Sequence, residues 1–284
     1  MVMTEVRTGN GVLVTRNESI ERYHADKKFI GSSLLKLFAE SPMAFDDYMN
    51  GVTEDKGGSH FDLGTHWHDI KEHKWDKWIE NKVIIPDRFC RADGSMSTKK
   101  EARDWVDNQI ANSREIISGE HLKTLEKMEA RFQMNTAAER LNNPLHGTPD
   151  REISIRFKEH GIRQRVRPDL LINGTLVDFK STREADPRRS FYNAVRRYRY
   201  DLSAAMYERG CQLANLCDGP MHFVVTSTVG DCQTQVLTLH SAIRSRAEQH
   251  YKVLLKDLAQ RRENSDWSPM GYGEIGVVTN PWEV

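Results

Sequence analysis

The sequence predicts an α/β fold in which a mixed β-sheet is flanked by helices and preceded by a mostly helical half. In the first half of the chain, apolar residues recur at helical spacing, most clearly in residues 61–80. From residue 151 onward, apolar and polar residues instead alternate, as they do in half-buried strands. Helical stretches then separate short strands. The order of helices, three strands, a helix, two strands and a helix favours one mixed sheet covered by helices.

The helical part spans residues 29–150 and follows a lead-in, residues 1–28, that we expect to be irregular. Spacing and capping residues predict two short helices in 31–51 with Pro42 starting the second, a helix in 61–80, and a helical stretch in 98–134 that is broken near Gly119. Proline and glycine residues between positions 144 and 149 end this part.

The predicted sheet core spans residues 151–265. Alternation and turn residues predict strands at 151–157, 162–172, 175–180, 222–229 and 232–240, and helices at about 187–216 and 241–263. Asn173 and Gly174 form a strong two-residue hairpin signal between the second and third strands. Because no linker divides the chain, we expect one domain over 29–265 and a loop-like tail over 266–284.

Composition describes a soluble protein, with 38% hydrophobic and 29% charged residues and a formal net charge of zero. No apolar run reaches the ~20 residues of a membrane span, and the first residues lack a secretory h-region, so we expect a cytoplasmic protein and no membrane partner. The four cysteines match no zinc spacing and lack the close C-x2-C pair. We therefore expect neither disulfides nor an iron–sulfur cluster.

Two aspartates and a lysine interrupt the apolar residues of the second and third predicted strands. Because the two-residue turn joins these strands antiparallel, position 172 pairs with 175 and Asp169 falls opposite Asp178. Directly opposed side chains on one face have Cβ atoms about 5 Å apart, and carboxylates so close can share a hard divalent cation such as Mg²⁺. Lys180 projects from the same face as Asp178.

This arrangement suits phosphate chemistry. Lys180 can orient or deprotonate a water molecule or stabilise charge on a phosphate group, and the backbone carbonyl of Phe179 can act as a further hard ligand. The alternative is an Asp–Lys ion pair on a solvent-facing strand, which is common for an isolated D-x-K pattern.

These residues resemble the signature of the PD-(D/E)XK nuclease superfamily, with Pro168-Asp169 and Asp178-Phe179-Lys180 at its positions. Three further segments resemble the exonuclease VIII (RecE-type) group of phage recombination exonucleases. They are an S-x-L-K…S-P region in 32–51, a G-x-x-x-H helix in 63–70, and a Y-x-x-Q-x-x-x-Y helix in 198–210. In the last of these, Ser203 stands where the group has glutamine.

The resemblance implies a restriction-endonuclease-like core and assigns roles to particular residues. His68 matches a metal-ligating histidine, Asp169 and Asp178 match the two acidic ligands, and Lys180 matches the catalytic lysine. Tyr207 matches the tyrosine of the last segment and is a candidate DNA contact.

The implied activity is that of an exodeoxyribonuclease that depends on Mg²⁺ or Mn²⁺. It would hydrolyse linear double-stranded DNA from its ends, in the 5′→3′ direction, during phage-type recombination or DNA repair. A single-strand annealing protein is the implied partner, and a ring-like homo-oligomer, a trimer or tetramer, is the implied assembly. A structure-specific repair nuclease of the same superfamily and a non-catalytic DNA-end binding module are the alternatives.

Other polar residues near the motif are candidate phosphate contacts. Arg165 and Arg167 alternate along the strand that precedes Asp169, and Ser181 and Thr182 follow Lys180. The arginines could equally pair with nearby carboxylates, and the hydroxyls could equally end the strand. An acid just before the sheet, Glu152, is expected to support the site from outside the ligand set.

Overall fold

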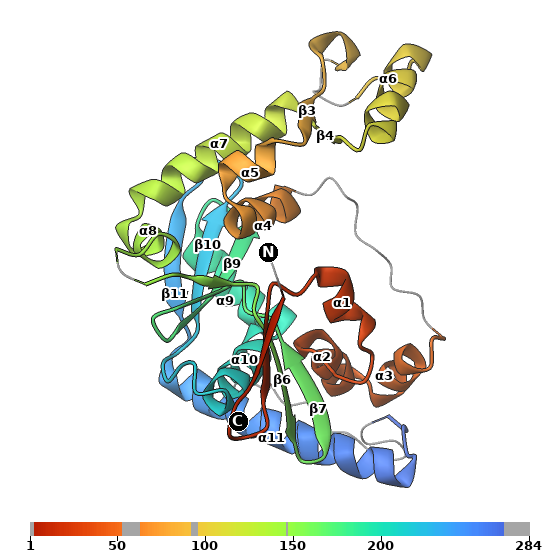
Figure 1. Ribbon diagram of the computed structural model, residues 1–284, viewed down its shortest axis with the longest axis vertical. Coiled ribbons are helices and arrows are strands. Elements are labelled where there is room, and N and C mark those ends of the chain that lie inside the picture. The colour runs from red at the N-terminus through yellow and green to blue at the C-terminus, as the bar shows by residue number, and fades with distance from the viewer. Residues whose placement is uncertain (1–2, 53–62, 92–95, 146, 270–284) are drawn as a thin grey trace.

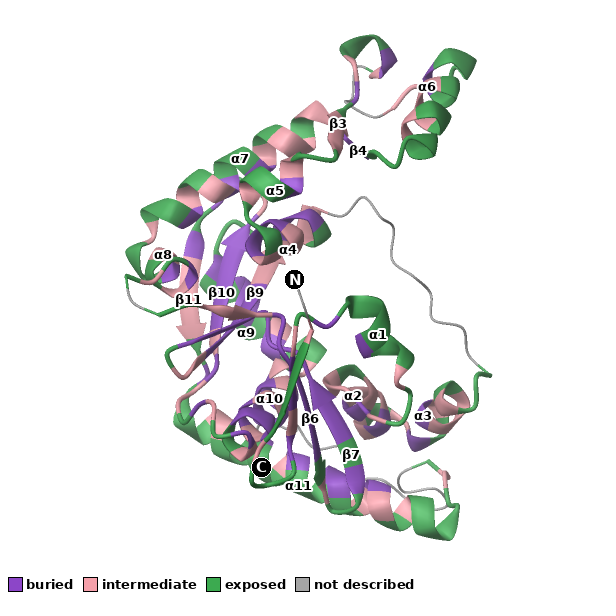
Figure 2. Ribbon diagram, viewed as in Figure 1, coloured by how far each residue is buried: buried purple, intermediate pink, exposed green. Residues whose placement is uncertain are grey.

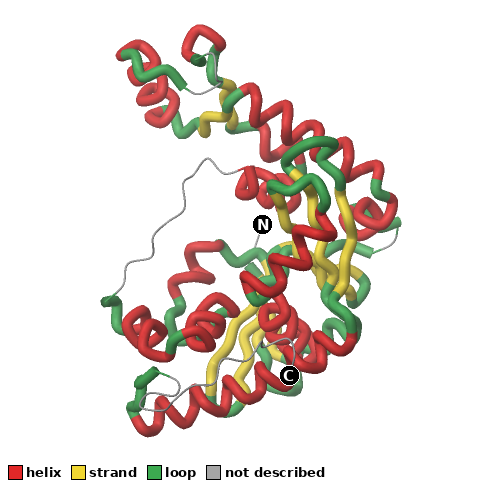
Figure 3. The backbone as a smooth tube through the Cα atoms, turned by 180° about the vertical axis from the view of Figure 1, so that it is seen from behind, coloured by secondary structure: helices red, strands yellow, loops and turns green. Residues whose placement is uncertain are grey.

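The computed structural model describes residues 3–52, 63–91, 96–145 and 147–269. Figure 1 shows two β-sheets that stand end to end in the middle of the molecule, with helices on their outer faces. The same arrangement is visible from behind in Figure 3, where the strands lie between layers of helices. This architecture confirms the predicted α/β class, although the single mixed sheet that we expected is divided in two.

Four strands form the first sheet, in the order β1 (Thr4–Arg7), β2 (Leu13–Arg16), β6 (Ser154–Glu159), β7 (Ile162–Val166). The expectation of an irregular lead-in was therefore wrong. Strands β1 and β2 form an antiparallel hairpin, β2 pairs with β6 through Val14 and Ile155, and helix α1 (Ile20–Ala25) follows. The lead-in is ordered because Val12 and Val14 are buried in the core, whereas the exposed residues of β1 hide the alternation.

Five strands form the second sheet, in the order β11 (Thr234–Thr238), β10 (His222–Ser227), β9 (Thr175–Thr182), β8 (Leu170–Ile172), β5 (Asp150–Arg151). This sheet is mixed, because β9 and β10 run parallel while its other neighbours are antiparallel. The hairpin register agrees with the sequence: Ile172 pairs with Thr175, and Leu170 with Val177. The tight turn thus aligns the residues just beyond, 169 and 178.

The strand predicted at 162–172 is in fact two strands, β7 and β8, which belong to different sheets. The break falls at residues 167–169. Pro168 has no N–H to donate to a ladder, so the chain leaves the first sheet there and enters the second at Leu170. As a result, Asp169 lies at the junction of the two sheets.

Helices cover both sheets and enclose two main apolar cores, which appear as the purple interior of Figure 2. The first core lies between the first sheet, one face of the second sheet and helices α2 (Ser32–Glu40), α3 (Pro42–Met49), α9 (Pro187–Tyr198), α10 (Tyr200–Leu213) and α11 (Ser241–Asn264), with α9 lying against the second sheet. The second lies between the second sheet and helices α4 (Leu63–His73), α5 (Trp75–Ile79), α7 (Gly119–Met134) and α8 (Thr136–Asn142). Because β9 contributes to both cores, its two faces are each covered.

A small projection extends from the end of α7, at the top of Figure 1. It contains β3 (Lys82–Ile84), a 3-10 helix (Asp87–Phe89), α6 (Lys100–Ala111) and β4 (Glu115–Ile117). The helical stretch expected over 98–134 is therefore interrupted by a strand, which pairs in parallel with β3. Its own apolar cluster, built on Ile85, Phe89 and Ile116, holds the projection together.

No helix in the described ranges is both long enough and apolar enough to cross a bilayer. Cys211, Cys217 and Cys232 are buried, Cys90 is half-buried, and all four thiols are free. Most of the predicted tail, from residue 270 onward, lies outside the described residues.

Candidate metal centre

The hairpin β8–β9 places the two predicted acids beside each other at the junction of the sheets. Asp169 immediately precedes β8, and its Oδ2 accepts a hydrogen bond from the backbone N–H of Phe179 at 2.7 Å. Each carboxylate belongs to a residue that is only 9% exposed. Burial, and then the charge of Asp169, raise the pKa of Asp178. Two buried carboxylates that repel in this way favour binding of a cation between them.

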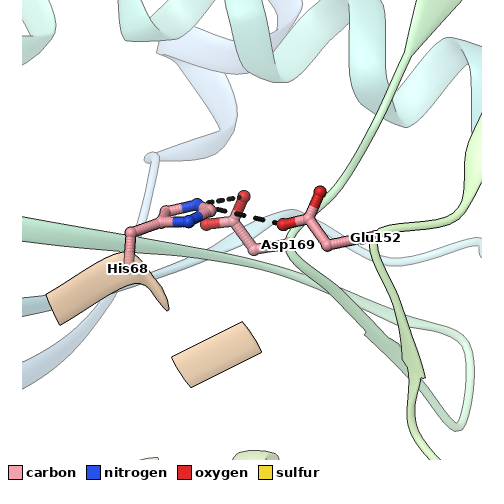
Figure 4. Close-up of side chains that lie close together, drawn as sticks. All are labelled: His68, Glu152 and Asp169. Atoms are coloured by element: carbon pink, nitrogen blue, oxygen red, sulfur yellow. Dashed lines mark ion pairs between the residues drawn. The ribbon is translucent and has the colours of Figure 1, made fainter. Parts of the chain in front are cut away.

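Helix α4 brings His68 to the same place. Its residues Trp67 and Ile70 pack in the second core together with Phe179, so the helix lies against β9. The His68 Nε2 lies 3.0 Å from Oδ1 of Asp169, as Figure 4 shows. The Asp169 charge raises the pKa of His68 to about 10, and His68 in turn lowers the pKa of Asp169 in spite of its burial.

Glu152 completes this group, although the sequence suggested only a supporting role for it. Its Oε1 lies 4.0 Å from the His68 Nε2 and has no hydrogen-bond partner among the described residues. Its other oxygen accepts a hydrogen bond from Arg167 at 2.5 Å. Ligand atoms of His68, Glu152 and Asp169 all lie within 4.8 Å of one another. The structure therefore places Glu152 among the candidate ligands.

The backbone and the electrostatics at Glu152 are both unusual. Its φ of 51° lies in the left-handed region, which is uncommon for a residue other than glycine, asparagine or aspartate. Burial, and then the Asp169 charge, raise its pKa to about 7. A strained, partly protonated acid that faces a histidine is typical of a site organised for binding rather than for stability.

Asp178 and Lys180 flank Phe179 on β9. The Lys180 Nζ forms an ion pair with the Asp178 carboxylate and lies 3.5 Å from the Phe179 carbonyl oxygen. Burial opposes the charged ammonium, but the Asp178 and Asp169 charges raise the pKa of Lys180 above its ordinary value. Without a metal ion, the Lys180 side chain therefore stays positively charged. Its ammonium group lies next to the Phe179 carbonyl, the group that we predicted to be a metal ligand.

A second lysine approaches the centre from α2. The Nζ atoms of Lys36 and Lys180 lie 5.8 and 5.5 Å from the centre of the same Tyr200 ring. Burial, and then the charge of Lys180, lower the pKa of Lys36. Within the described parts of the chain, Lys36 forms no ion pair. Lys36 is the lysine of the S-x-L-K segment in residues 32–51.

The donor set fits a hard divalent cation. The His68 imidazole and the carboxylates of Glu152 and Asp169 converge, while the Asp178 carboxylate beside them is paired with Lys180. One buried oxygen of this group, Glu152 Oε1, lacks a hydrogen-bond partner among the described residues. Buried oxygens without partners are costly, and coordination to a cation relieves that cost. Oxygen-rich sites of this kind suit Mg²⁺ or Mn²⁺, whereas the absence of thiolates disfavours softer metals.

The two arginines predicted as phosphate contacts are instead buried. Arg165 donates from Nη1 to the backbone carbonyls of Tyr23 and Asp26, the latter at 2.8 Å. Arg167 pairs with Glu152, and both arginines are less than a tenth exposed. Both guanidinium groups are thus bound within the protein, because α1 and Glu152 cover them, and contact of either arginine with DNA stays a prediction. The alternative role, pairing with carboxylates, holds for Arg167.

The hydroxyl residues after Lys180 differ from each other. Thr182 shares a short hydrogen bond with Ser190 and accepts one from the N–H of Glu184 at 3.2 Å, so it ends the strand locally. Ser181 lines a cavity that opens beside Lys180. Tyr207 is partly buried against the first core, and burial raises its pKa well above the ordinary value. Contact of Ser181 or Tyr207 with DNA stays a prediction.

Both a family model and solved structures are similar to this chain. The model of a family described as a PDDEXK-like domain of unknown function matches residues 31–279 of this chain. A solved structure, the "Putative exonuclease" from Eubacterium rectale, is similar with a TM-score of 0.56 and 14% sequence identity over 89% of each chain. At this identity the likeness concerns the fold alone. No curated protein matches the chain.

Proposed function

We propose that this chain, which belongs to the family of PDDEXK-like domains, is a metal-dependent deoxyribonuclease. Membership confirms the superfamily and the core fold that the sequence predicted. The observation that carries the proposal is the convergence of His68, Asp169, Asp178 and Lys180 at one junction between the sheets. An ion-pair network would not by itself need a buried carboxylate oxygen without a hydrogen-bond partner, such as Glu152 Oε1.

The residues of the chain divide the chemical work. Oxygens of Asp169, Asp178 and Glu152 and the neutral imidazole of His68 would hold Mg²⁺ or Mn²⁺, together with the Phe179 carbonyl. When bound, such an ion lowers the pKa of a water molecule and offsets the charge of a phosphodiester. His68 must release its proton to become a ligand. The positive charge of the metal ion would then take the place of the imidazolium charge beside the carboxylates of Asp169 and Glu152.

Lys180 would hold the attacking water and the phosphate in line. Its raised pKa keeps the ammonium charged in the metal-free protein, so we assign it to positioning and to charge stabilisation at the phosphorus. The water oxygen would form a bond to phosphorus as the bond to the 3′ oxygen breaks, and the proton that the water loses to solvent is balanced by the proton that the leaving 3′ oxygen takes up. Lys180 is held for this role by Asp178 on one side and by the ring of Tyr200 on the other.

The finer proposal is a 5′→3′ exonuclease that acts on linear double-stranded DNA ends in phage-type recombination. The segments that resemble the RecE-type group support it, and the similar solved structure, named as an exonuclease, supports the exonuclease part. We also propose a ring-like trimer or tetramer and a single-strand annealing partner. Sedimentation of the purified protein tests the oligomer, and co-purification with a candidate annealing protein tests the partner.

Digestion of plasmid DNA tests the proposed activity. Linear and covalently closed forms of one plasmid are incubated with the protein in Mg²⁺ or in EDTA. We expect loss of the linear form in Mg²⁺ only. Equal loss of the closed circle would replace the exonuclease by an endonuclease, and no hydrolysis of either form with Mg²⁺ or Mn²⁺ would reject the nuclease. Linear duplexes blocked at the 5′ or the 3′ ends then give the polarity.

A further inference from the structure

A cavity of about 470 Å³ opens directly beside the proposed metal centre. Lys180 forms part of its wall, so the cavity is continuous with the place where the phosphate would react. Its polar lining includes side chains from the end of β9, from α9 and from the start of α10, among them Ser181, Ser190, Asn193, Arg197, Tyr198 and Tyr200. One acid, Glu184, also lines it, next to Arg183. None of these residues belongs to the candidate ligand set.

One wall of the cavity is aromatic, and a strained residue shapes it. Helix α9 ends at Tyr198 and α10 begins at Tyr200, with Arg199 between them at a φ of 51°. Arg199 is held in this left-handed conformation by hydrogen bonds to Asp201 and His250. As a result, the Tyr198 and Tyr200 rings stand 5.7 Å apart on the same cavity. A left-handed residue is a common way to end a helix, and here it sets the angle at which α10 follows α9.

The chemistry of the lining suits a nucleotide. The Arg197 guanidinium lies 5.4 Å from the centre of the Tyr198 ring, and Tyr198 is 49% exposed, which leaves it available to a ligand. Aromatic rings stack on bases of any sequence. Hydroxyl, amide and guanidinium groups donate hydrogen bonds to sugar and phosphate oxygens.

The size of the cavity fits one nucleotide better than a base pair. Its volume of about 470 Å³ lies near the lower end of the range found for small-molecule pockets. We propose that this cavity holds a single unpaired nucleotide of the strand being cut, with its base against Tyr198. The inference rests on the proposed nuclease function and specifies the form in which that site accepts DNA.

A consequence is that a duplex end must open before its phosphodiester reaches Lys180. Unpairing costs a few kcal/mol, and least where the bases are mismatched. The protein should therefore hydrolyse ends with unpaired terminal nucleotides faster than fully paired ends. The stacking contact with Tyr198 should provide much of this preference.

The test compares two tyrosines of the same helix. Tyr198→Ala removes the proposed stacking ring, whereas Tyr192→Ala removes a ring that is 64% exposed on another side of α9 and does not line the cavity. Initial rates are measured in Mg²⁺ on end-labelled duplexes whose terminal pairs are matched or mismatched. We expect the wild type and Tyr192→Ala to prefer mismatched ends, and Tyr198→Ala to lose about tenfold in kcat/KM on them through a higher KM.

A second measurement separates this inference from the nuclease proposal. Binding of thymidine 5′-monophosphate is followed by calorimetry in EDTA, so that neither catalysis nor a metal contributes. The wild type and Tyr192→Ala should bind the nucleotide, and Tyr198→Ala should bind it at least several-fold more weakly. The inference is overturned if the wild type hydrolyses matched and mismatched ends at equal rates. It is also overturned if Tyr198→Ala and Tyr192→Ala bind the nucleotide equally well. Nucleotide binding without any hydrolysis would instead count against the nuclease proposal and leave the cavity assigned.

Discussion

Glu152→Gln offers a sharp prediction, because the structure makes the charge of Glu152 costly in the metal-free protein. Burial and the Asp169 charge raise its pKa from 4.5 to about 7. The folded protein therefore binds more protons than the unfolded chain between these two values, and stability falls as pH rises through that window. Since one pKa unit corresponds to about 1.4 kcal/mol, the ionised carboxylate destabilises the fold by about 3 kcal/mol at pH 8.

Glutamine has the same shape but no charge, and its carbonyl can still accept the hydrogen bond from Arg167. We expect Glu152→Gln to be more stable than the wild type by up to about 3 kcal/mol in EDTA at pH 8, and equal to it at pH 4.5. With saturating Mg²⁺ the order should reverse or the gap should close, because the wild type gains a ligand interaction that the variant lacks. Activity should fall in parallel.

Urea denaturation at the two pH values, with EDTA or Mg²⁺, measures all four stabilities. A variant that is less stable than the wild type in EDTA at pH 8 would refute the electrostatic reasoning. A variant that gains as much stability from Mg²⁺ as the wild type would remove Glu152 from the ligand set. The same experiment with Glu159→Gln, an acid of β6 that pairs with Arg209 far from the candidate ligands, controls for general effects of charge removal.

Three further changes test other parts of the structure. Lys180→Met should lower the rate of DNA hydrolysis by about 10²–10³-fold, as expected for loss of a charge at the phosphate, with Mn²⁺ binding retained in calorimetry; a rate near that of the wild type would exclude the proposed role. Lys36→Met should raise the KM for DNA in steady-state digests, whereas Lys36→Arg should keep it near the wild-type value. The reason is that the Lys36 ammonium has no ion pair in the described structure and can therefore bind phosphate. Equal KM values for the two variants would contradict this. Gly210→Ala should lower the free energy of unfolding in urea by about 1–3 kcal/mol, because the new Cβ would lie 2.7 Å from a Phe157 ring carbon. Gly219→Ala should leave stability nearly unchanged, because nothing lies within 4 Å of its new Cβ. A Gly210→Ala variant as stable as the wild type would mean that the Phe157 ring can move aside.

The hairpin that carries the acids could be read from the sequence because its contacts are local. A two-residue Asn-Gly turn fixes the register of the strands on either side, and the observed pairing of Ile172 with Thr175 follows it. The same locality made helices such as α11 predictable, since their spacing is set within a few turns. The sequence also shows Pro168, but it does not show that the chain passes there from one sheet to the other. That passage depends on the second sheet, which pairs with Leu170.

Pairings between distant segments could not be read in this way. Strand β2 joins β6 across more than a hundred residues, and nothing in its four residues specifies that partner. Contacts of α1 are another example. Nothing in residues 1–28 shows that they cover β7, so the hydrogen bonds of Arg165 to the carbonyls of Tyr23 and Asp26 could not be foreseen.

The position of Glu152 shows a related limit. The sequence places an acid at the start of the sheet but does not show that its backbone turns left-handed or that His68 of α4 lies 4.0 Å away. Both properties arise from the junction of the two sheets. Functional sites often depart from local rules in this manner, which is why the ligand set was only partly predictable.

A crystal of the protein soaked in Mn²⁺ and measured for anomalous scattering tests the central claim most directly. The account predicts a strong anomalous peak at the sheet junction, within about 2.5 Å of carboxylate oxygens of Asp169 and Asp178 and of the His68 imidazole. An anomalous map with no peak there at saturating Mn²⁺, or with a peak that Asp178 does not reach, would contradict it.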